Sequence, residues 1–210
     1  MAQSKVDVSN IALNMIGAKR ISTFTQDCPE ARSISAVYED IRDEVLCEHP
    51  WTFAQERVIL ATLATPPIFT DDRMTIAYAK PVDFLKIEAV NDLSAVVKVE
   101  REGIFSDTTS LKMRYTFRND DPTTYFPKFT LALACRLAAE VCFNLTESFQ
   151  KSEGLMDLYI KIKLPSAISE DSKQGTPIQA NMDEWTGARI YGNAAIAPQT
   201  PNAATWSPPW

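Results

Sequence analysis

The chain has 210 residues, which is long enough for one well-formed hydrophobic core, or for one core with a small satellite. Hydrophobic residues make up 45% of it and charged residues 23%, which is ordinary for a globular domain and excludes general disorder. The formal net charge of -6 argues against a protein that binds nucleic acid or an anionic membrane non-specifically, because both partners require clustered Lys and Arg.

The sequence predicts neither a secretory signal nor a membrane-spanning helix. Residues 1–10 contain no apolar run of the kind that a secretory signal has. The most apolar run, residues 129–143, is too short for a spanning helix of about 20 residues, and it carries Arg136 and Glu140. We therefore expect a protein that is soluble and cytoplasmic after synthesis, with no membrane partner.

The cysteines are predicted to be reduced thiols of the core. They lie at Cys28, Cys47, Cys135 and Cys142, no pair has CxxC spacing, and the single histidine leaves no Cys/His set for zinc. Cys135 and Cys142 share one face of a predicted helix but lie two turns apart, too far for a disulfide.

The first two predicted helices lie near the N-terminus. Apolar residues recur at helical spacing over residues 6–17, and Gly17 suits the position that follows a helix end. A stronger apolar stripe runs from residue 34 to residue 46, with Asp27 as a possible cap and Pro29 in the first turn. Pro50 ends this helix, because the residue before a proline is pushed out of helical geometry.

The spacing of apolar residues changes between about residues 56 and 118. Five segments read as strands, several with the alternation of half-buried antiparallel strands: residues 57–60, 74–78, 84–90, 96–100 and 111–117. Turn-forming pairs separate them at residues 66–67, 71–72, 91–92 and 102–103. The pattern predicts a small antiparallel β unit between helices.

Two more helices follow the strands. A helix is expected from about residue 125, with Pro127 in its first turn and apolar residues on nearly every side from residue 129 to residue 143, so we expect it to be buried. The last helix is expected from Ser148 to about residue 163, continuing past Pro165 towards Ser172, with Gly175 ending it.

Residues 176–210 have a different composition. They are rich in proline and nearly uncharged, yet they hold three of the four tryptophans of the chain. Aromatic anchors on an extended segment are typical of a docking arm, because they give a large contact area for little ordering entropy. We predict that the arm contacts a neighbouring chain, the alternative being that it folds back on its own subunit, and the predicted interface residues are Trp185, Arg189, Tyr191, Trp206 and Trp210.

The sequence contains no motif that predicts a catalytic site. Phosphate-binding and dinucleotide-binding glycine motifs are missing, as is a nucleophile motif, and His49 is interpreted as an imidazole at a helix end beside Trp51. The acidic residues are interpreted as a solvated helix face and as turns: Asp40, Asp43, Glu44, Asp71, Asp72, Asp120 and Asp121. The sequence therefore predicts no enzyme and no catalytic, cofactor-binding or metal-binding residues.

The predicted fold class is α+β, with an antiparallel helical bundle and a small antiparallel β unit between helices two and three. The helical body comprises residues 1–54 and 121–175, the inserted β unit residues 55–120, and the extended C-terminal arm residues 176–210.

Four stretches within residues 6–175 stand in a distinctive order and spacing. They are residues 12–18 (ALNMIGA), residues 28–31 (CPEA) leading to residues 48–54 (EHPWTFA), residues 111–115 (LKMRY) running to residues 121–122 (DP), and residues 129–139 (FTLALACRLAA) with the helix around Tyr159. In these features the chain resembles the tail tubular protein A family, the head-to-tail adaptors of short-tailed bacteriophages. The stretch beyond Gly175 matches no pattern of that family.

The resemblance implies a structural protein of a phage virion. Its subunits would form a ring, a dodecamer in the family, between the portal protein and the tail nozzle protein, with DNA passing through the lumen without specific binding. The helices would form the body of the ring, and the β unit would meet neighbouring proteins, a tail fibre or spike among them. We would then expect the chain in the host cytoplasm during assembly and afterwards at the head–tail junction of the virion.

Two other functions stay open at this point. One is another phage head-completion or tail-tube subunit with a similar helical body. The other is a small metal-dependent hydrolase built on the carboxylates, which predicts a metal-binding cleft where the adaptor predicts large subunit contacts.

Overall fold

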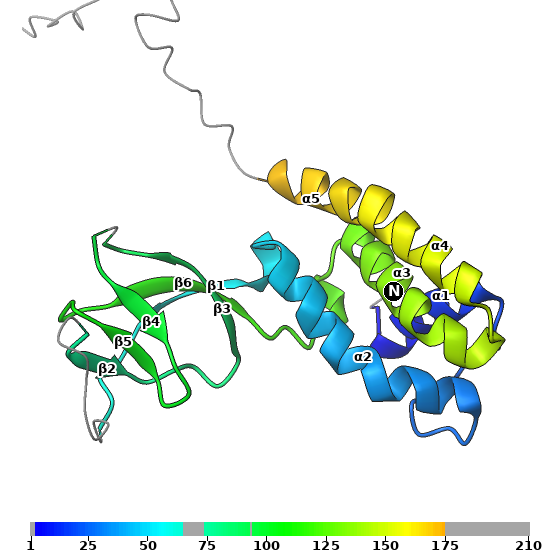
Figure 1. Ribbon diagram of the computed structural model, residues 1–210, viewed down its shortest axis with the longest axis horizontal. Coiled ribbons are helices and arrows are strands. Elements are labelled where there is room, and N and C mark those ends of the chain that lie inside the picture. Colours follow the sequence, from blue (N-terminus) through cyan, green and yellow to red (C-terminus); the bar gives the residue numbers. More distant parts are fainter. Residues whose placement is uncertain (1–2, 65–73, 93, 175–210) are drawn as a thin grey trace, which may run out of the picture. The chain divides into compact units, whose positions relative to one another are not determined.

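Helices enclose a β segment along the chain in the computed structural model, which describes residues 3–64, 74–92 and 94–174. The helical elements are α1 (Lys5–Ile16), α2 (Pro29–Glu48), α3 (Pro127–Thr146), α4 (Phe149–Leu158), the π-helix η3 (Tyr159–Lys163) and α5 (Leu164–Ser172). The strands are β1 (Gln55–Ile59), β2 (Ile76–Tyr78), β3 (Phe84–Val90), β4 (Val97–Val99), β5 (Ile104–Ser106) and β6 (Lys112–Phe117), with single 3-10 turns η1 (Thr52–Ala54) and η2 (Pro122–Thr124) (Figure 1). This arrangement confirms the predicted α+β class with strands between the second and third helices.

The ends of α1 and α2 follow from local chemistry. Ser4 and Asp7 form a reciprocal capping box at the start of α1, and Gly17 ends that helix in the left-handed conformation, as its position indicates. The predicted cap of α2 is wrong: Cys28 is the N-cap, and its sulfur accepts a hydrogen bond from the backbone N–H of Ala31 at 3.4 Å. Asp27 instead pairs with Arg32 on the surface.

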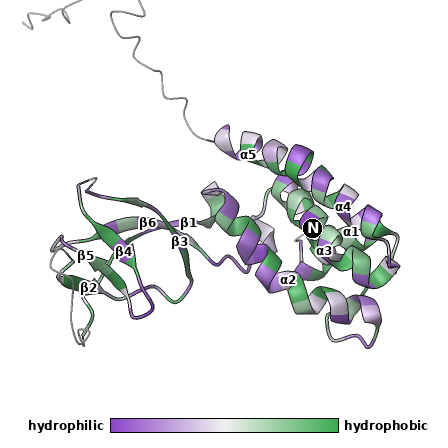
Figure 2. Cartoon of the chain, in the orientation of Figure 1, coloured by the Kyte–Doolittle hydropathy of each residue, from purple (hydrophilic) through white to green (hydrophobic). Residues whose placement is uncertain are grey.

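Helix α3 is the central element of the helical body. It packs against α1, α2, α4 and α5, and hydrophobic residues cover most of its length (Figure 2). By length and composition alone it could cross a membrane, so the expectation that its apolar run is too short was wrong. Its burial among the other helices identifies it as the core helix of this fold, because a core helix is apolar on nearly all sides.

The last helical elements form one continuous structure, which we call the α4–α5 rod (α4, η3 and α5). It begins at the N-cap Ser148 and runs through Pro165 to Ser172, as predicted. A proline inside an α-helix removes one hydrogen bond and crowds the preceding turn. The π-helix directly before Pro165 widens that turn, where the N–H of Leu164 bonds to the carbonyl of Tyr159, so the rod continues.

The strands form two three-stranded antiparallel sheets, where the sequence predicted a single β unit of five strands. One sheet has the order β1-β6-β3 and the other β2-β5-β4. Strand β5 was not predicted, and it pairs with both β2 and β4. The two sheets share one apolar cluster, whose buried members are Leu60, Tyr78, Ile104, Leu111, Met113 and Tyr115.

An aromatic cluster connects the end of α2 to the start of β1. Trp51 is fully buried, its indole N–H donates to the carbonyl of Val45 at 2.9 Å, and its ring meets Phe129 edge to face at 4.9 Å. Phe53 packs on the same Phe129 ring at 4.8 Å. The stretch EHPWTFA thus turns the chain out of α2 and anchors β1 on the core helix.

Candidate interaction surfaces

The predicted arm lies outside the residues that the structure describes. Trp185, Arg189, Tyr191, Trp206 and Trp210 therefore stay a prediction from composition. The same holds for the expected turns at residues 66–67 and 71–72 and for Gly175 as the end of the last helix. Candidate sites must come from the described part of the chain.

His49 has a structural environment, as the sequence indicates. It is the C-cap of α2, and its ring stands edge-on to Trp51 at 4.8 Å. Its Nε2 lies 3.2 Å from the buried carboxylate of Asp171, which also accepts hydrogen bonds from the N–H of Thr52 at 3.1 Å and from its Oγ1 at 2.7 Å. Because the Thr52 hydroxyl donates to the acid and not to the imidazole, this trio does not activate a nucleophile. It ties α5 to the start of the β segment.

Three of the acidic residues, Asp43, Glu44 and Asp120, are paired with arginines. Arg42 is fully buried and binds both Asp43 and Asp120, and Arg118 donates to Asp43 at 2.8 Å. Glu44 pairs with Arg136 at 3.1 Å. Ion pairing of this kind leaves these carboxylates bound to protein groups instead of converging on a cavity.

The cysteines are free thiols in this structure. Burial raises the pKa of the Cys135 and Cys47 thiols, which keeps them protonated and unreactive. Within residues 3–64, 74–92 and 94–174, no group of three or more His, Cys, Asp or Glu side chains is placed to hold a metal ion.

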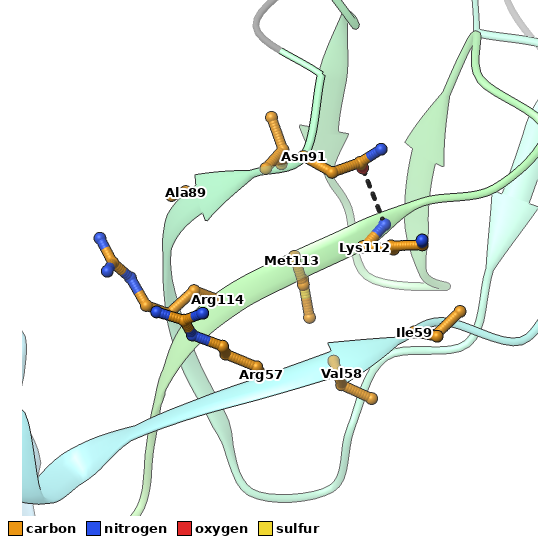
Figure 3. Close-up of a pocket in the computed structure, with 9 residues that line it drawn as sticks. Arg57, Val58, Ile59, Ala89, Asn91, Lys112, Met113 and Arg114 are labelled. Atoms are coloured by element: carbon orange, nitrogen blue, oxygen red, sulfur yellow. Dashed lines mark hydrogen bonds between the residues drawn. The ribbon is translucent and has the colours of Figure 1, made fainter. Parts of the chain in front are cut away.

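A hollow lies on the sheet β1-β6-β3. Its volume is about 430 Å³, and its walls are residues 57–59 of β1, 89–91 of β3 and 112–114 of β6 (Figure 3). We call it the basic hollow, because Arg57, Lys112 and Arg114 line it. Val58 and Met113, which also line the hollow, belong to the apolar cluster of the two sheets. The alternation of strand residues therefore places the side chains of Arg57, Lys112 and Arg114 on the other face of the sheet.

The register brings two of these cations directly together. Arg57 of β1 is the cross-strand partner of Arg114 of β6, and Ala89 of β3 is the partner of Arg114 on its other side. Their side chains extend to the same side in the view of Figure 3. Like charges directly opposite each other destabilise a sheet. The small Ala89 leaves space beside Arg114.

The basic hollow is not neutralised by the described residues. Arg57, Arg114 and the Lys112 amine form no ion pair with any of them, and the buried Nε of Arg114 has no hydrogen-bond partner there. The neighbouring acid on β3, Glu88, is already engaged: Thr116 donates to it at 2.9 Å and Lys86 lies 3.5 Å from it. Among the described residues, the hollow is therefore a site of positive charge without a counter-ion, on a chain that is acidic as a whole.

A second surface is apolar and lies on the α4–α5 rod. Phe149 is 70% exposed, Ile160 51% and Ile162 57%. Phe149 and Ile160 are eleven positions apart, about three helical turns, so they lie near one side of the rod. Phe143, at the end of α3, is also more than half exposed. Large apolar side chains gathered on one element are typical of a protein–protein contact.

The described part of the chain is an α+β protein with a cationic hollow on one sheet and exposed apolar side chains on the α4–α5 rod. Compared with known proteins, the chain matches no protein-family model and no curated protein.

Sequence reasoning missed both described surfaces. The cations of the basic hollow come from strands far apart in the chain, and only the register of β1 on β6 brings them together. The sequence predicted an inward stripe of Leu155, Leu158, Tyr159 and Ile162, and that prediction was wrong for Ile162, which is 57% exposed. Phe149 and Ile160 fall outside that stripe, so their exposure was detectable from the sequence.

Proposed function

We propose that this chain is a structural head-to-tail adaptor of a short-tailed phage virion. The observation that carries the proposal is the pair of exposed apolar side chains Phe149 and Ile160, which lie near one side of the α4–α5 rod. When another subunit covers these side chains, the complex is stabilised, because each Å² of buried apolar area contributes about 25 cal/mol. The resemblance of residues 6–175 to adaptor proteins supports the same reading.

In the proposed assembly, adaptor subunits associate side by side into a closed ring. Each subunit presents one surface to the neighbour ahead and a different surface to the neighbour behind, as a ring requires. The portal protein is the proposed partner on one side of the ring and the tail nozzle protein on the other. The acidic balance suits a channel wall, because a basic wall would bind the phosphates of passing DNA.

The proposal is tested by placing charge on the apolar rod surface. The double variant Phe149→Asp with Ile160→Asp is expected to fold, since both side chains are exposed and such substitutions change stability by only about 0.5 kcal/mol. Its incorporation into phage particles is expected to fall by about tenfold or more, as for the loss of an interface hot spot. Quantitative mass spectrometry of purified particles measures it.

The matched control adds the same charge at exposed polar positions of the rod, Gln150→Asp with Ser169→Asp. The control is expected to be incorporated like the unaltered chain. Equal incorporation of both double variants would contradict the assignment of the rod surface to subunit contacts.

A further inference from the structure

The basic hollow needs an anion that the described residues do not supply. Arg57 and Arg114 are paired across the sheet, Lys112 lies one row further along, and none of the three is neutralised by the described part of the chain. An acid bound between two guanidinium groups would remove the repulsion and form charge-assisted hydrogen bonds. Nucleic acid is a poor candidate for that acid, because the chain as a whole carries a net charge of -6.

The same chain contains a short acidic and aromatic segment that matches the hollow. Residues 175–210 hold three charged residues, Asp183, Glu184 and Arg189, and Trp185 follows the two acids directly. Prolines stand only at Pro177 and then from Pro198 onwards, so residues 178–197 keep every backbone N–H.

The distance between the acidic and aromatic residues of the segment also matches the distance between the cationic and apolar residues of β1. A peptide that binds as an extended strand places side chains two positions apart on the same side, about 7 Å from each other. Asp183 and Trp185 have this separation in the sequence. Along β1 the same spacing separates Arg57 from Ile59, whose side chain is 67% exposed. A carboxylate can therefore meet the arginine pair while the indole covers the exposed isoleucine.

We infer that the basic hollow binds residues 183–185 of a neighbouring copy of this chain, with Asp183 at Arg57 and Arg114 and Trp185 over Ile59. This inference rests on the proposed ring, because it assigns the contact between successive subunits. The contact would provide a binding site for the predicted C-terminal arm and a carboxylate counter-ion for Arg57 and Arg114.

Zero-length cross-linking tests the inference on the full chain. A carbodiimide joins a lysine amine directly to a carboxylate, and Lys112 stands on the wall of the hollow. Equal amounts of ¹⁴N-labelled and ¹⁵N-labelled chain are mixed, cross-linked and analysed by mass spectrometry. Links of Lys112 to Asp183 or Glu184 that join chains of different label are the expected result. The link between Lys128 and Glu170, which lie 3.0 Å apart within one chain, is the internal standard.

Two double variants separate docking from general charge effects. Arg57→Ser with Arg114→Ser keeps Lys112 and is expected to lower the inter-chain link about tenfold relative to the standard, as for a lost charge-pair anchor. Lys80→Ser with Arg101→Ser removes the same charge from exposed positions outside the hollow and is expected to leave the link unchanged.

Three results would overturn the inference: no Lys112 link while the standard forms, a link that survives loss of both arginines, or links only between chains of like label. None of these three results would contradict the proposed function, as long as the chain is still incorporated into particles. Conversely, an inter-chain Lys112 link on a chain that never enters particles would contradict the proposed function alone.

Discussion

Replacing Trp51 with Ala is expected to lower the free energy of unfolding by about 3–5 kcal/mol, the range for deleting a large buried aromatic side chain. Trp51 is fully buried between the end of α2 and the core helix, where its ring packs against Phe129 and His49. Its loss leaves a cavity at the point where β1 is anchored. Urea unfolding followed by circular dichroism measures the change.

Trp51→Phe is the matched control for this prediction. It keeps most of the aromatic contact but removes the indole N–H, which donates to the carbonyl of Val45 at 2.9 Å. We expect a smaller loss of about 1–2 kcal/mol, mainly from the lost hydrogen bond and the smaller ring. A Trp51→Ala variant as stable as the unaltered chain would show that the aromatic cluster does not anchor the strands.

A chain ending at Gln174 is expected to fold but to lose its attachment to the assembly. All helices and strands of the described fold lie within residues 5–172, so the melting temperature should stay within a few degrees. Binding is expected to fall more than about hundredfold, because the removed segment holds Trp185, Trp206 and Trp210, and buried tryptophans contribute about 2 kcal/mol or more each at interfaces.

Thermal unfolding and co-sedimentation with the portal protein of the same phage, measured on both chain lengths, test this prediction. The full chain should co-sediment and the shortened chain should not. A sharp drop in melting temperature, with binding retained by the folded fraction, would mean that residues 175–210 belong to the fold of their own subunit.

Much of the fold was predictable because local signals and burial agree. The capping residues of α1, the proline starts of α2 and α3 and the apolar stripes all favour the helices that form. The continuation past Pro165 was predicted, whereas the π-helix that makes it possible was not.

The missed strand and the missed cap have physical causes. Ile104, Phe105 and Ser106 are all buried, so β5 shows none of the alternation that marks a half-buried strand. At the start of α2, Asp27 has the better capping side chain, but Cys28 occupies the extended position whose side chain faces the first turn.

The candidate surfaces depend on contacts that the sequence does not encode locally. Arg57 and Arg114 become neighbours only through the antiparallel register, and Asp171 reaches Thr52 only because α5 packs beside the end of α2. Composition alone marked residues 176–210 as a docking segment, since tryptophan on a proline-rich, nearly uncharged stretch is unusual for a solvated tail.

The central claim, that this chain is a structural adaptor, is tested most directly by its copy number in purified, DNA-filled phage particles. Quantitative mass spectrometry with the portal protein as internal reference gives that number. The account predicts as many copies of this chain as of the portal protein. Absence of the chain from such particles, or a trace amount relative to the portal protein, would contradict it.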